Sequence, residues 1–157
     1  MEIKIYLIES KRIIREGITN LLSPVEDLKL IGQSESVATA GAALEKSDIL
    51  LIDQSGDFES FLDSIIAVRE KYKALKVVVF SDKEDDLDML QKMLEAGIEG
   101  YLTKNASKEE LFHSFRKVQD DGIYICTAFS MPKCNLLSTT DEKPRAGDCS
   151  VNCVLPP

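Results

Sequence analysis

The segment Val77–Lys104 reads VVVFSDKEDDLDMLQKMLEAGIEGYLTK and contains one complete strand–helix–strand unit. It opens with an unbroken apolar run, Val77–Phe80, which has the length of one buried strand. Apolar residues then recur at helical spacing, at Leu87, Leu90, Met93 and Leu94. Gly97 is expected to end that helix, and a second, short strand is expected at Gly100–Thr103. The segment therefore predicts two parallel strands joined by a crossover helix.

The same alternation occupies most of the remaining chain. Earlier strands are expected at Ile3–Ile8, Leu28–Gly32 and Ile49–Ile52, the last ending in Asp53. Further helices are expected over residues 13–22, 37–44, 58–68 and 107–118, the last opened by the capping box Ser107-Lys-Glu-Glu110. Alternating strands and helices are typical of a parallel sheet covered on both faces. We therefore expect an α/β, flavodoxin-like, doubly wound sheet of five parallel strands flanked by five helices.

The chain has 157 residues, enough for one domain of ordinary size. We expect that domain to span residues 1–125. After Gly122 the strand–helix pattern decays, and residues 126–157 are expected to form an irregular or disordered tail. This tail lacks the length and periodicity of a helix-turn-helix.

The charge of the chain argues against direct binding to nucleic acid. Its net charge is -8, and the acidic excess lies in residues 1–122, which hold 24 acidic and 16 basic side chains. Duplex binding needs basic side chains that neutralise phosphates. The sequence also shows no uninterrupted apolar stretch of membrane-spanning length and no signal-peptide layout. We therefore expect a cytoplasmic protein without membrane contact.

Polar side chains follow four of the expected strands: Glu9, Ser10, Asp53, Ser81, Asp82 and Lys104. In an open parallel sheet the functional crevice lies beyond the carboxyl ends of the strands, so these side chains should converge. Asp53 by itself could be an ordinary solvated turn residue. In combination, the acids, the hydroxyl and the ammonium supply a cation site, an attacking oxygen and donors for transferred oxygens. That set is typical of phosphoryl transfer.

Three sequence features resemble receiver domains of NarL/FixJ-type (LuxR-type) response regulators. They are Ile14-Arg-Glu-Gly-Ile18, Asp53 at the end of a strand, and Glu95-Ala-Gly-Ile-Glu-Gly-Tyr-Leu-Thr-Lys-Asn-Ala-Ser107. The resemblance runs from Lys4 to about Ile125. It implies a two-component phosphorelay protein that accepts a phosphoryl group from a sensor histidine kinase and controls an output, expected to be transcription.

The resemblance also implies roles for individual residues. Asp53 would be the phosphoacceptor, Lys104 the phosphate-binding lysine, Ser81 the switch hydroxyl and Tyr101 the aromatic side chain that rotates inward. A magnesium ion would be held by Glu9, Ser10, Asp53 and Ser55. The sequence departs from the family in three places. Ser10 replaces a second acid, Asp82 replaces a small residue, and the loop Gln54–Asp57 lacks the usual methionine and proline. Because magnesium prefers anionic oxygen ligands, we expect a weakened site.

Two functions remain open at this stage. One is a phosphorylated receiver that switches conformation and forms a homodimer. The alternative is a phosphorylation-independent pseudo-receiver that serves as a protein-interaction or dimerisation module. In either case DNA would be reached only through an output domain absent from this chain. A truncated sequence, a natural stand-alone receiver or a changed reading frame would each explain that absence.

An enzyme on the same scaffold, such as a flavin protein or an aspartate-based phosphatase, is disfavoured. The chain lacks a phosphate-cradling loop after the first strand and a second acid two residues after Asp53. His113 is expected to be a partly exposed helix residue. The cysteines 126, 134, 149 and 153 have spacings that match no common zinc module, and we expect them to be reduced and incidental.

Overall fold

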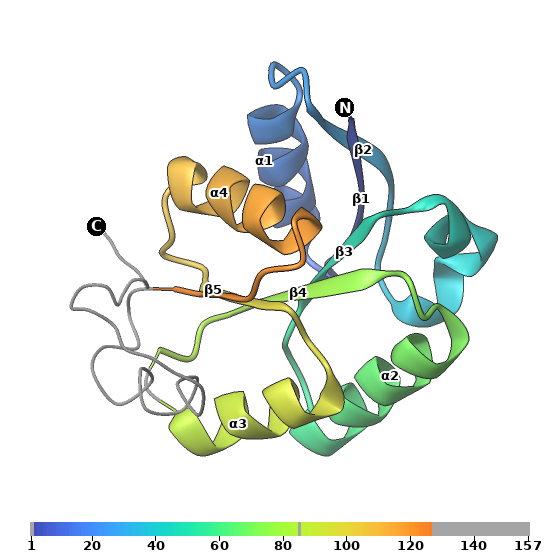
Figure 1. Ribbon diagram of the computed structural model, residues 1–157, viewed down its shortest axis with the longest axis vertical. Coiled ribbons are helices and arrows are strands. Elements are labelled where there is room, and N and C mark those ends of the chain that lie inside the picture. The colour runs from blue at the N-terminus through green and yellow to red at the C-terminus, as the bar shows by residue number, and fades with distance from the viewer. Residues whose placement is uncertain (1, 85, 127–157) are drawn as a thin grey trace.

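The computed structural model describes residues 2–84 and 86–126, which form a parallel sheet covered by helices on both faces (Figure 1). The strands are β1 (Ile3–Ile8), β2 (Leu28–Ser34), β3 (Ile49–Asp53), β4 (Lys76–Ser81), β5 (Gly100–Thr103) and β6 (Tyr124–Ile125). Their order in the sheet is β2-β1-β3-β4-β5-β6, and every neighbouring pair is parallel. The doubly wound, flavodoxin-like architecture is confirmed.

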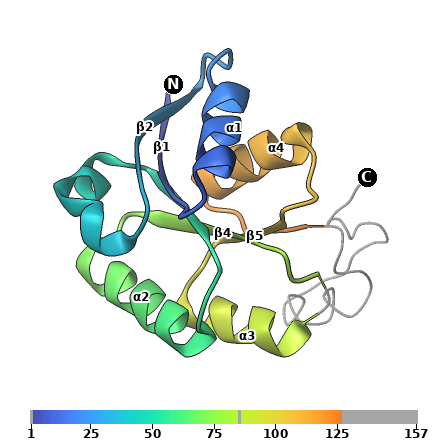
Figure 2. The ribbon, with the colours of Figure 1, turned by 180° about the vertical axis from the view of Figure 1, so that it is seen from behind.

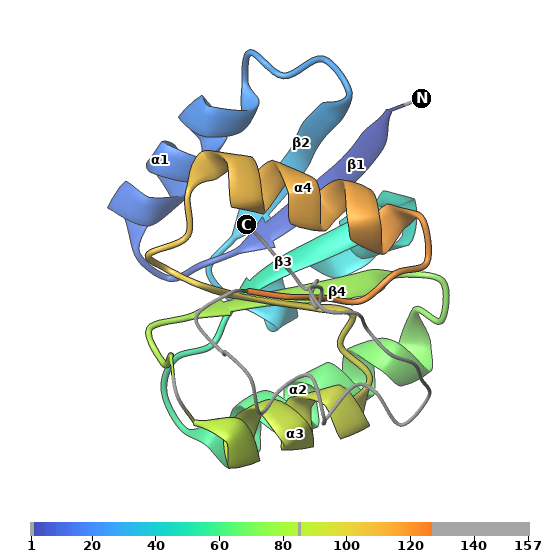
Figure 3. The same ribbon diagram turned by 60° about the vertical axis from the view of Figure 1, so that its left-hand side comes forward.

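Four α-helices cover this sheet in the described part of the chain. They are α1 (Arg12–Leu22), α2 (Phe58–Lys71), α3 (Leu87–Ala96) and α4 (Lys108–Gln119). Helices α1 and α4 lie on one face, and α2 and α3 lie on the other, as the turned view in Figure 3 and the rear view in Figure 2 show. Within residues 2–84 and 86–126, no helix combines the length and apolarity needed to cross a bilayer.

The central strands explain why the sheet is covered on both faces. The β3 residues Ile49–Ile52 and the β4 residues Val77–Val79 are all buried, whichever face their side chains point to. Strands of this kind read as continuous apolar runs because neither face meets water. Their polar residues are therefore displaced to the strand ends, where β3 ends in Asp53 and β4 ends in Ser81.

The sheet contains one strand more than the five that the sequence predicts. The additional strand β6 pairs with β5, placing Gly100 opposite Tyr124 and Tyr101 opposite Ile125. The Cys126 N–H extends this pairing by donating to the carbonyl oxygen of Tyr101 at 2.9 Å. A run of two residues is too short for its periodicity to indicate a strand. Apart from Cys126, the tail predicted for residues 126–157 lies outside the described residues.

The helix expected over residues 37–44 is wrong. The chain forms two short 3₁₀ segments instead, η1 (Val37–Thr39) and η2 (Gly41–Lys46). Gly41, at the junction, has a φ of 63°. A left-handed residue cannot continue a right-handed α-helix, so the segment is interrupted there. Leu44 is still buried, which accounts for the apolar spacing in this part of the sequence.

Local capping signals lie where the sequence places them. At the start of α4, Ser107 and Glu110 form a complete capping box, in which each side chain accepts the backbone N–H of the other residue. At the end of α3, Gly97 adopts a φ of 107° and donates its N–H to Met93 and Leu94. These signals set the positions of the helices on either side of β5.

Alanine substitutions at two glycines should change the stability of the protein in opposite directions. At Gly97 the left-handed backbone disfavours alanine, and the added Cβ would lie 3.3 Å from Arg69 Nε. We expect Gly97→Ala to lower the free energy of unfolding by about 1–2 kcal/mol. Gly17 lies inside α1, where an added Cβ meets nothing within 4 Å. Gly17→Ala should raise that free energy by about 0.5–1 kcal/mol. Urea unfolding measures both changes, and shifts of the same sign would contradict this account.

Candidate functional site

Asp53 and Lys104 lie together at the carboxyl edge of the sheet. Asp53 ends β3, and Lys104 directly follows β5, with β4 between the two strands. The register places Asp53 opposite Phe80 and Ser81 opposite Thr103, so the three strands end at the same level. The Lys104 Nζ lies 2.5 Å from Asp53 Oδ1. The convergence expected for these two side chains is therefore present in the structure.

Glu9 supplies a second carboxylate to the same ammonium group. Its side chain is fully buried, and Oε1 lies 3.7 Å from Lys104 Nζ. The other oxygen, Oε2, accepts the Lys11 backbone N–H at 2.8 Å. The Arg15 guanidinium donates to the carbonyl oxygens of Glu9 and Ser10 and thereby holds the loop after β1. Two buried carboxylates thus share one ammonium, which leaves the cluster with an excess negative charge.

The protonation of Lys104 reflects this environment. Burial by itself would lower the pKa of the Lys104 ammonium. The contact with Asp53 and the negative charges of Asp53, Glu9 and Asp82 outweigh burial and raise the pKa above its ordinary value. Because the folded-state pKa is raised, the stabilisation from this ion pair is complete below the ordinary lysine pKa. It is lost as the pH rises through the raised value.

The carboxylate oxygens of this cluster have the chemistry of a cation site. Glu9 Oε1 and Asp53 Oδ2 are buried without a hydrogen-bond donor, and Asp53 Oδ1 is buried against the Lys104 ammonium. Among the described residues, Lys104 provides the only cationic group within 4 Å of them. Such oxygens fit a hard divalent cation like magnesium. Ser10 and Ser55, the other two predicted ligands, are exposed. No group of three or more His, Cys, Asp or Glu residues suited to a metal occurs in residues 2–84 and 86–126.

Ser81 and Tyr101 belong to a hydrogen-bonded chain next to this cluster. The buried Ser81 hydroxyl donates to Gln54 Oε1 at 3.0 Å, and its oxygen accepts the Lys83 N–H at 3.1 Å. The Tyr101 hydroxyl donates to the Lys83 carbonyl oxygen at 2.8 Å. Burial raises the pKa of Tyr101 to about 12, so the phenol keeps its proton at neutral pH. Tyr101 thus already has its side chain inside the domain.

Gln54 is a site residue that the sequence analysis missed. It follows Asp53 directly, and only 8% of its surface is exposed. The signal in the sequence is its position directly after Asp53, and because the Gln54 amide is buried in the fold it needs a hydrogen-bond partner. Asp82, in contrast, is exposed, and its negative charge raises the pKa of Lys104 less than the charges of Asp53 and Glu9 do.

The remaining candidates lie outside this cluster. His113 is exposed on α4, and its ring meets the Tyr124 ring edge to face, with 5.5 Å between the centroids. Cys126 is buried directly after β6. The other three cysteines, at 134, 149 and 153, lie outside the described residues, so the prediction that they are reduced and incidental stays a prediction.

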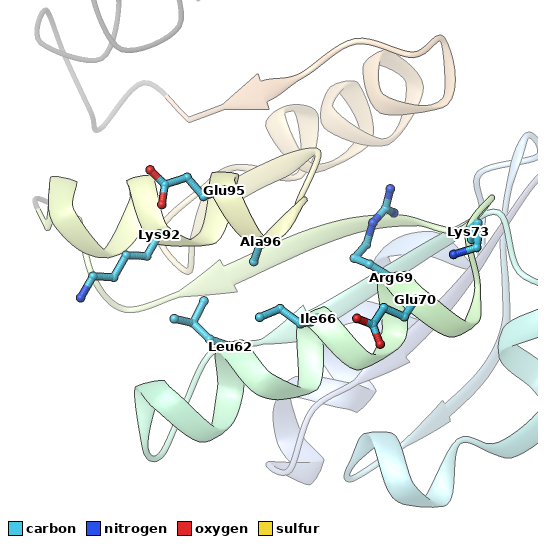
Figure 4. Close-up of a pocket in the computed structure, with 8 residues that line it drawn as sticks. All are labelled: Leu62, Ile66, Arg69, Glu70, Lys73, Lys92, Glu95 and Ala96. Atoms are coloured by element: carbon cyan, nitrogen blue, oxygen red, sulfur yellow. The ribbon is translucent and has the colours of Figure 1, made fainter.

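A groove between α2 and α3 is separate from the strand-end cluster (Figure 4). Apolar side chains from both helices lie beside acidic and basic ones along it. Its lining residues are Leu62, Ile66, Arg69, Glu70, Lys73, Lys92, Glu95 and Ala96. None of the predicted site residues is among them.

Comparisons with known proteins show a matching family. The family model for the response regulator receiver domain matches residues 5–116. Transcriptional regulatory protein YdfI of Bacillus subtilis is 30% identical over 113 residues, which cover 71% of this chain and 52% of YdfI. Response regulator GacA of Pseudomonas aeruginosa is 29% identical over 119 residues, covering 74% of this chain and 55% of GacA. The chain therefore spans about half the length of these curated relatives.

Solved structures show the same fold at lower sequence identity. The isolated REC domain of RcsB from Salmonella enterica serovar Typhimurium superposes with a TM-score of 0.71 at 17% identity, covering 82% of this chain and 96% of that domain. A LuxR-family two-component response regulator from Aurantimonas sp. SI85-9A1 gives a TM-score of 0.68 at 20% identity, covering 80% of this chain and 90% of that one. At these identities the likeness is evidence for the fold alone.

Removing the Lys104 ammonium should destabilise the fold. In Lys104→Met, the buried carboxylates of Asp53 and Glu9 lose their shared cation, and we expect the free energy of unfolding to fall by roughly 3 kcal/mol. Adding Asp53→Asn to that variant should recover part of the loss, because one uncompensated charge is removed. Urea unfolding at neutral pH measures both effects. Lys92→Met, on the exposed surface of α3, is the matched control and should change stability by less than about 0.5 kcal/mol.

Proposed function

This chain belongs to the response regulator receiver domain family, and on that basis we propose that Asp53 accepts a phosphoryl group from a sensor histidine kinase. Membership confirms the resemblance to NarL/FixJ-type receivers seen in the sequence. Receiver domains are generally signalling modules and not enzymes. The single observation that carries the proposal for Asp53 is its contact with Lys104 at the carboxyl edge of the sheet.

The proposed step is an in-line displacement at phosphorus. One carboxylate oxygen of Asp53 forms a bond to phosphorus while the bond from phosphorus to the histidine nitrogen breaks. The leaving nitrogen keeps the electron pair and remains on the kinase, and Asp53 becomes an acyl phosphate. The Lys104 ammonium lies beside the attacking group, where it offsets the negative charge of the transferred oxygens. Lys104 is suited to this role because its raised pKa keeps it charged at neutral pH.

Glu9 and Asp53 are the residues that would hold a magnesium ion. Their buried oxygens Glu9 Oε1 and Asp53 Oδ2, which lack donors, support that role, and a bound magnesium ion would neutralise charge on the phosphoryl oxygens. The described site offers two carboxylates, and Ser10 is exposed where the family usually has a second acid after the first strand. We therefore propose that magnesium binding is weaker here than in a receiver with three acids.

The output of the switch is proposed to be transcriptional. An aspartyl phosphate adds negative charge and strong acceptors next to Lys104 and Ser81, and Tyr101 lies one strand away from Ser81 on β5. A change at these residues would alter the surface of α3, β5 and α4, on which a homodimer or an output partner could form. YdfI, similar to this chain over about half its own length, is named as a transcriptional regulatory protein.

A second function is supported by the hydrogen-bonded chain through Ser81. The Ser81 hydroxyl already has an acceptor in Gln54, and Tyr101 is already buried with its hydroxyl bonded. Both switch residues are therefore held by the protein's own atoms. This arrangement favours a pseudo-receiver that binds partners without phosphorylation. The two functions differ in whether a phosphoryl group on Asp53 changes the structure.

Phosphorylation of Asp53 is tested with a small phosphodonor. Incubation with acetyl phosphate and magnesium should add one phosphoryl group to the wild-type chain, detected by intact-mass spectrometry. Asp53→Asn should remain unmodified, because the amide has no nucleophilic carboxylate. Asp63→Asn, on the exposed surface of α2, is the matched control and should be modified like the wild type. Absence of modification in the wild type at millimolar magnesium would favour the pseudo-receiver, and modification of Asp53→Asn would refute the assignment of the acceptor.

Magnesium binding should be strengthened by restoring an acid after β1. We expect Ser10→Asp to raise the affinity for magnesium on the order of tenfold, because the cation gains an anionic ligand. Isothermal titration with magnesium chloride measures the change. Ser23→Asp, at the far end of α1, adds the same charge away from the site and should leave the affinity unchanged. An equal gain in both variants would show a general charge effect and not a restored ligand.

A further inference from the structure

Gln54 directly follows β3 and connects the end of that strand to the end of β4 through two hydrogen bonds. Its backbone N–H donates to the Phe80 carbonyl oxygen at 2.9 Å, which continues the pairing of β3 with β4 by one residue. This pairing directs the side chain toward the end of β4, where Oε1 accepts the Ser81 hydroxyl at 3.0 Å. Both residues are buried, so water does not compete effectively for this bond.

The bond between Gln54 and Ser81 continues into the loop between β4 and α3. The Ser81 oxygen accepts the Lys83 N–H, and the Lys83 carbonyl oxygen accepts the Tyr101 hydroxyl. One residue farther on, Glu84 accepts the side-chain amide of Asn105 at 2.6 Å. The loop is therefore attached to β3 through Gln54 and to β5 and the segment after it through Tyr101 and Asn105. A displacement of the Ser81 hydroxyl would alter the first of these attachments.

A serine hydroxyl has one proton and can donate it to one acceptor at a time. Donation to a phosphoryl oxygen on Asp53 would therefore break the bond to Gln54. The Gln54 carbonyl oxygen would then be left without its donor in a buried position, which is costly. Gln54 thus opposes the rotation that a phosphoryl group would demand of Ser81.

We propose that Gln54 is a positioning residue that competes with the phosphoryl group on Asp53 for the Ser81 hydroxyl. Through Ser81 and Lys83, it holds the loop before α3 and the buried Tyr101 in one arrangement. Gln54 thereby limits how far phosphorylation can change the surface formed by α3, β5 and α4. The inference rests on the proposed function, since it concerns the response of the same site to a phosphoryl group.

The competition is tested with beryllofluoride, which forms a phosphoryl-like adduct on aspartate. Gln54→Leu keeps a side chain of similar volume and removes the acceptor. We expect beryllofluoride with magnesium to bind this variant roughly tenfold more tightly than the wild type, equivalent to about 1.4 kcal/mol. The affinity is measured by NMR titration of the full chain. Gln91→Leu, on exposed α3, makes the same chemical change elsewhere and should leave the affinity unchanged.

A double-mutant cycle distinguishes competition for Ser81 from a general effect of the leucine. In a Ser81→Ala background the hydroxyl is absent, so Gln54→Leu should no longer tighten binding. A tenfold gain that persists in that background would overturn the proposal, as would equal affinities of the wild type and Gln54→Leu. Failure of both proteins to bind beryllofluoride would overturn the proposed function together with the competition.

The hydrogen bond itself is tested without any phosphoryl mimic, so that its outcome is independent of the proposed function. In the free Gln54→Leu variant the Ser81 hydroxyl must find a new acceptor, which should shift the Lys83 amide resonance and accelerate its hydrogen exchange. Gln91→Leu should leave both unchanged. An unaltered Lys83 amide in Gln54→Leu would show that Gln54 does not hold the loop, and this result would overturn the proposal even if Asp53 is phosphorylated.

Discussion

The Lys104 ammonium shared between the buried carboxylates of Asp53 and Glu9 is the interaction on which the site depends. Glu9 directly follows β1, Asp53 ends β3 and Lys104 directly follows β5, so the three groups meet only because parallel strands end at one edge of the sheet. Because the cluster is buried, its two negative charges and one positive charge are poorly screened by water, and the excess negative charge interacts strongly with its surroundings. The cluster is therefore suited to a divalent cation and to a phosphoryl group bound with it.

The core of the sheet explains how this imbalance is maintained. β3 and β4 are apolar along their lengths and covered on both faces, so their positions are set by close packing. Asp53 and Ser81 are attached to the ends of these rigid strands. Lys104 is placed similarly by β5, whose flanking helices are limited by the Gly97 stop and the Ser107 capping box. Rigid strand ends hold the charged groups close despite the energetic cost of burying them.

The hydrogen-bonded chain from Gln54 to Tyr101 relates the two functional interpretations. A receiver and a pseudo-receiver can share the same pocket and differ in the balance of a few hydrogen bonds around Ser81. If Gln54 Oε1 is the stronger acceptor of the Ser81 hydroxyl, the loop between β4 and α3 keeps its arrangement even when Asp53 is phosphorylated. Where the phosphoryl group is the stronger, Ser81 moves and the loop follows. The three departures from the family therefore affect different steps of one proposed switch. Ser10 affects magnesium binding, Asp82 affects the charge near Lys104, and Gln54 affects the Ser81 hydroxyl.

Most of the fold follows from patterns that are local in the chain. Continuous apolar runs identify β1, β3 and β4, and helical spacing identifies α1, α2, α3 and α4, with end signals at Gly97 and Ser107. The segment around Gly41 was misread because alanine-rich apolar spacing is compatible with both an α-helix and two 3₁₀ turns. Strand β6 was missed because two residues carry no periodicity. The left-handed backbone at Gly41 interrupts the helix, and pairing with β5 makes the two residues of β6 a strand.

The amino-acid sequence alone identifies the parallel α/β fold and the set of polar residues at its strand ends, because burial imposes a periodicity that each segment carries within itself. The proximity of Asp53 to Lys104 also follows from that fold. The sharing of Lys104 with Glu9, the bond from Ser81 to Gln54 and the buried position of Tyr101 depend on the folded arrangement. These contacts join different strands, and whether two such side chains meet is set by strand register and rotamers that no single segment specifies.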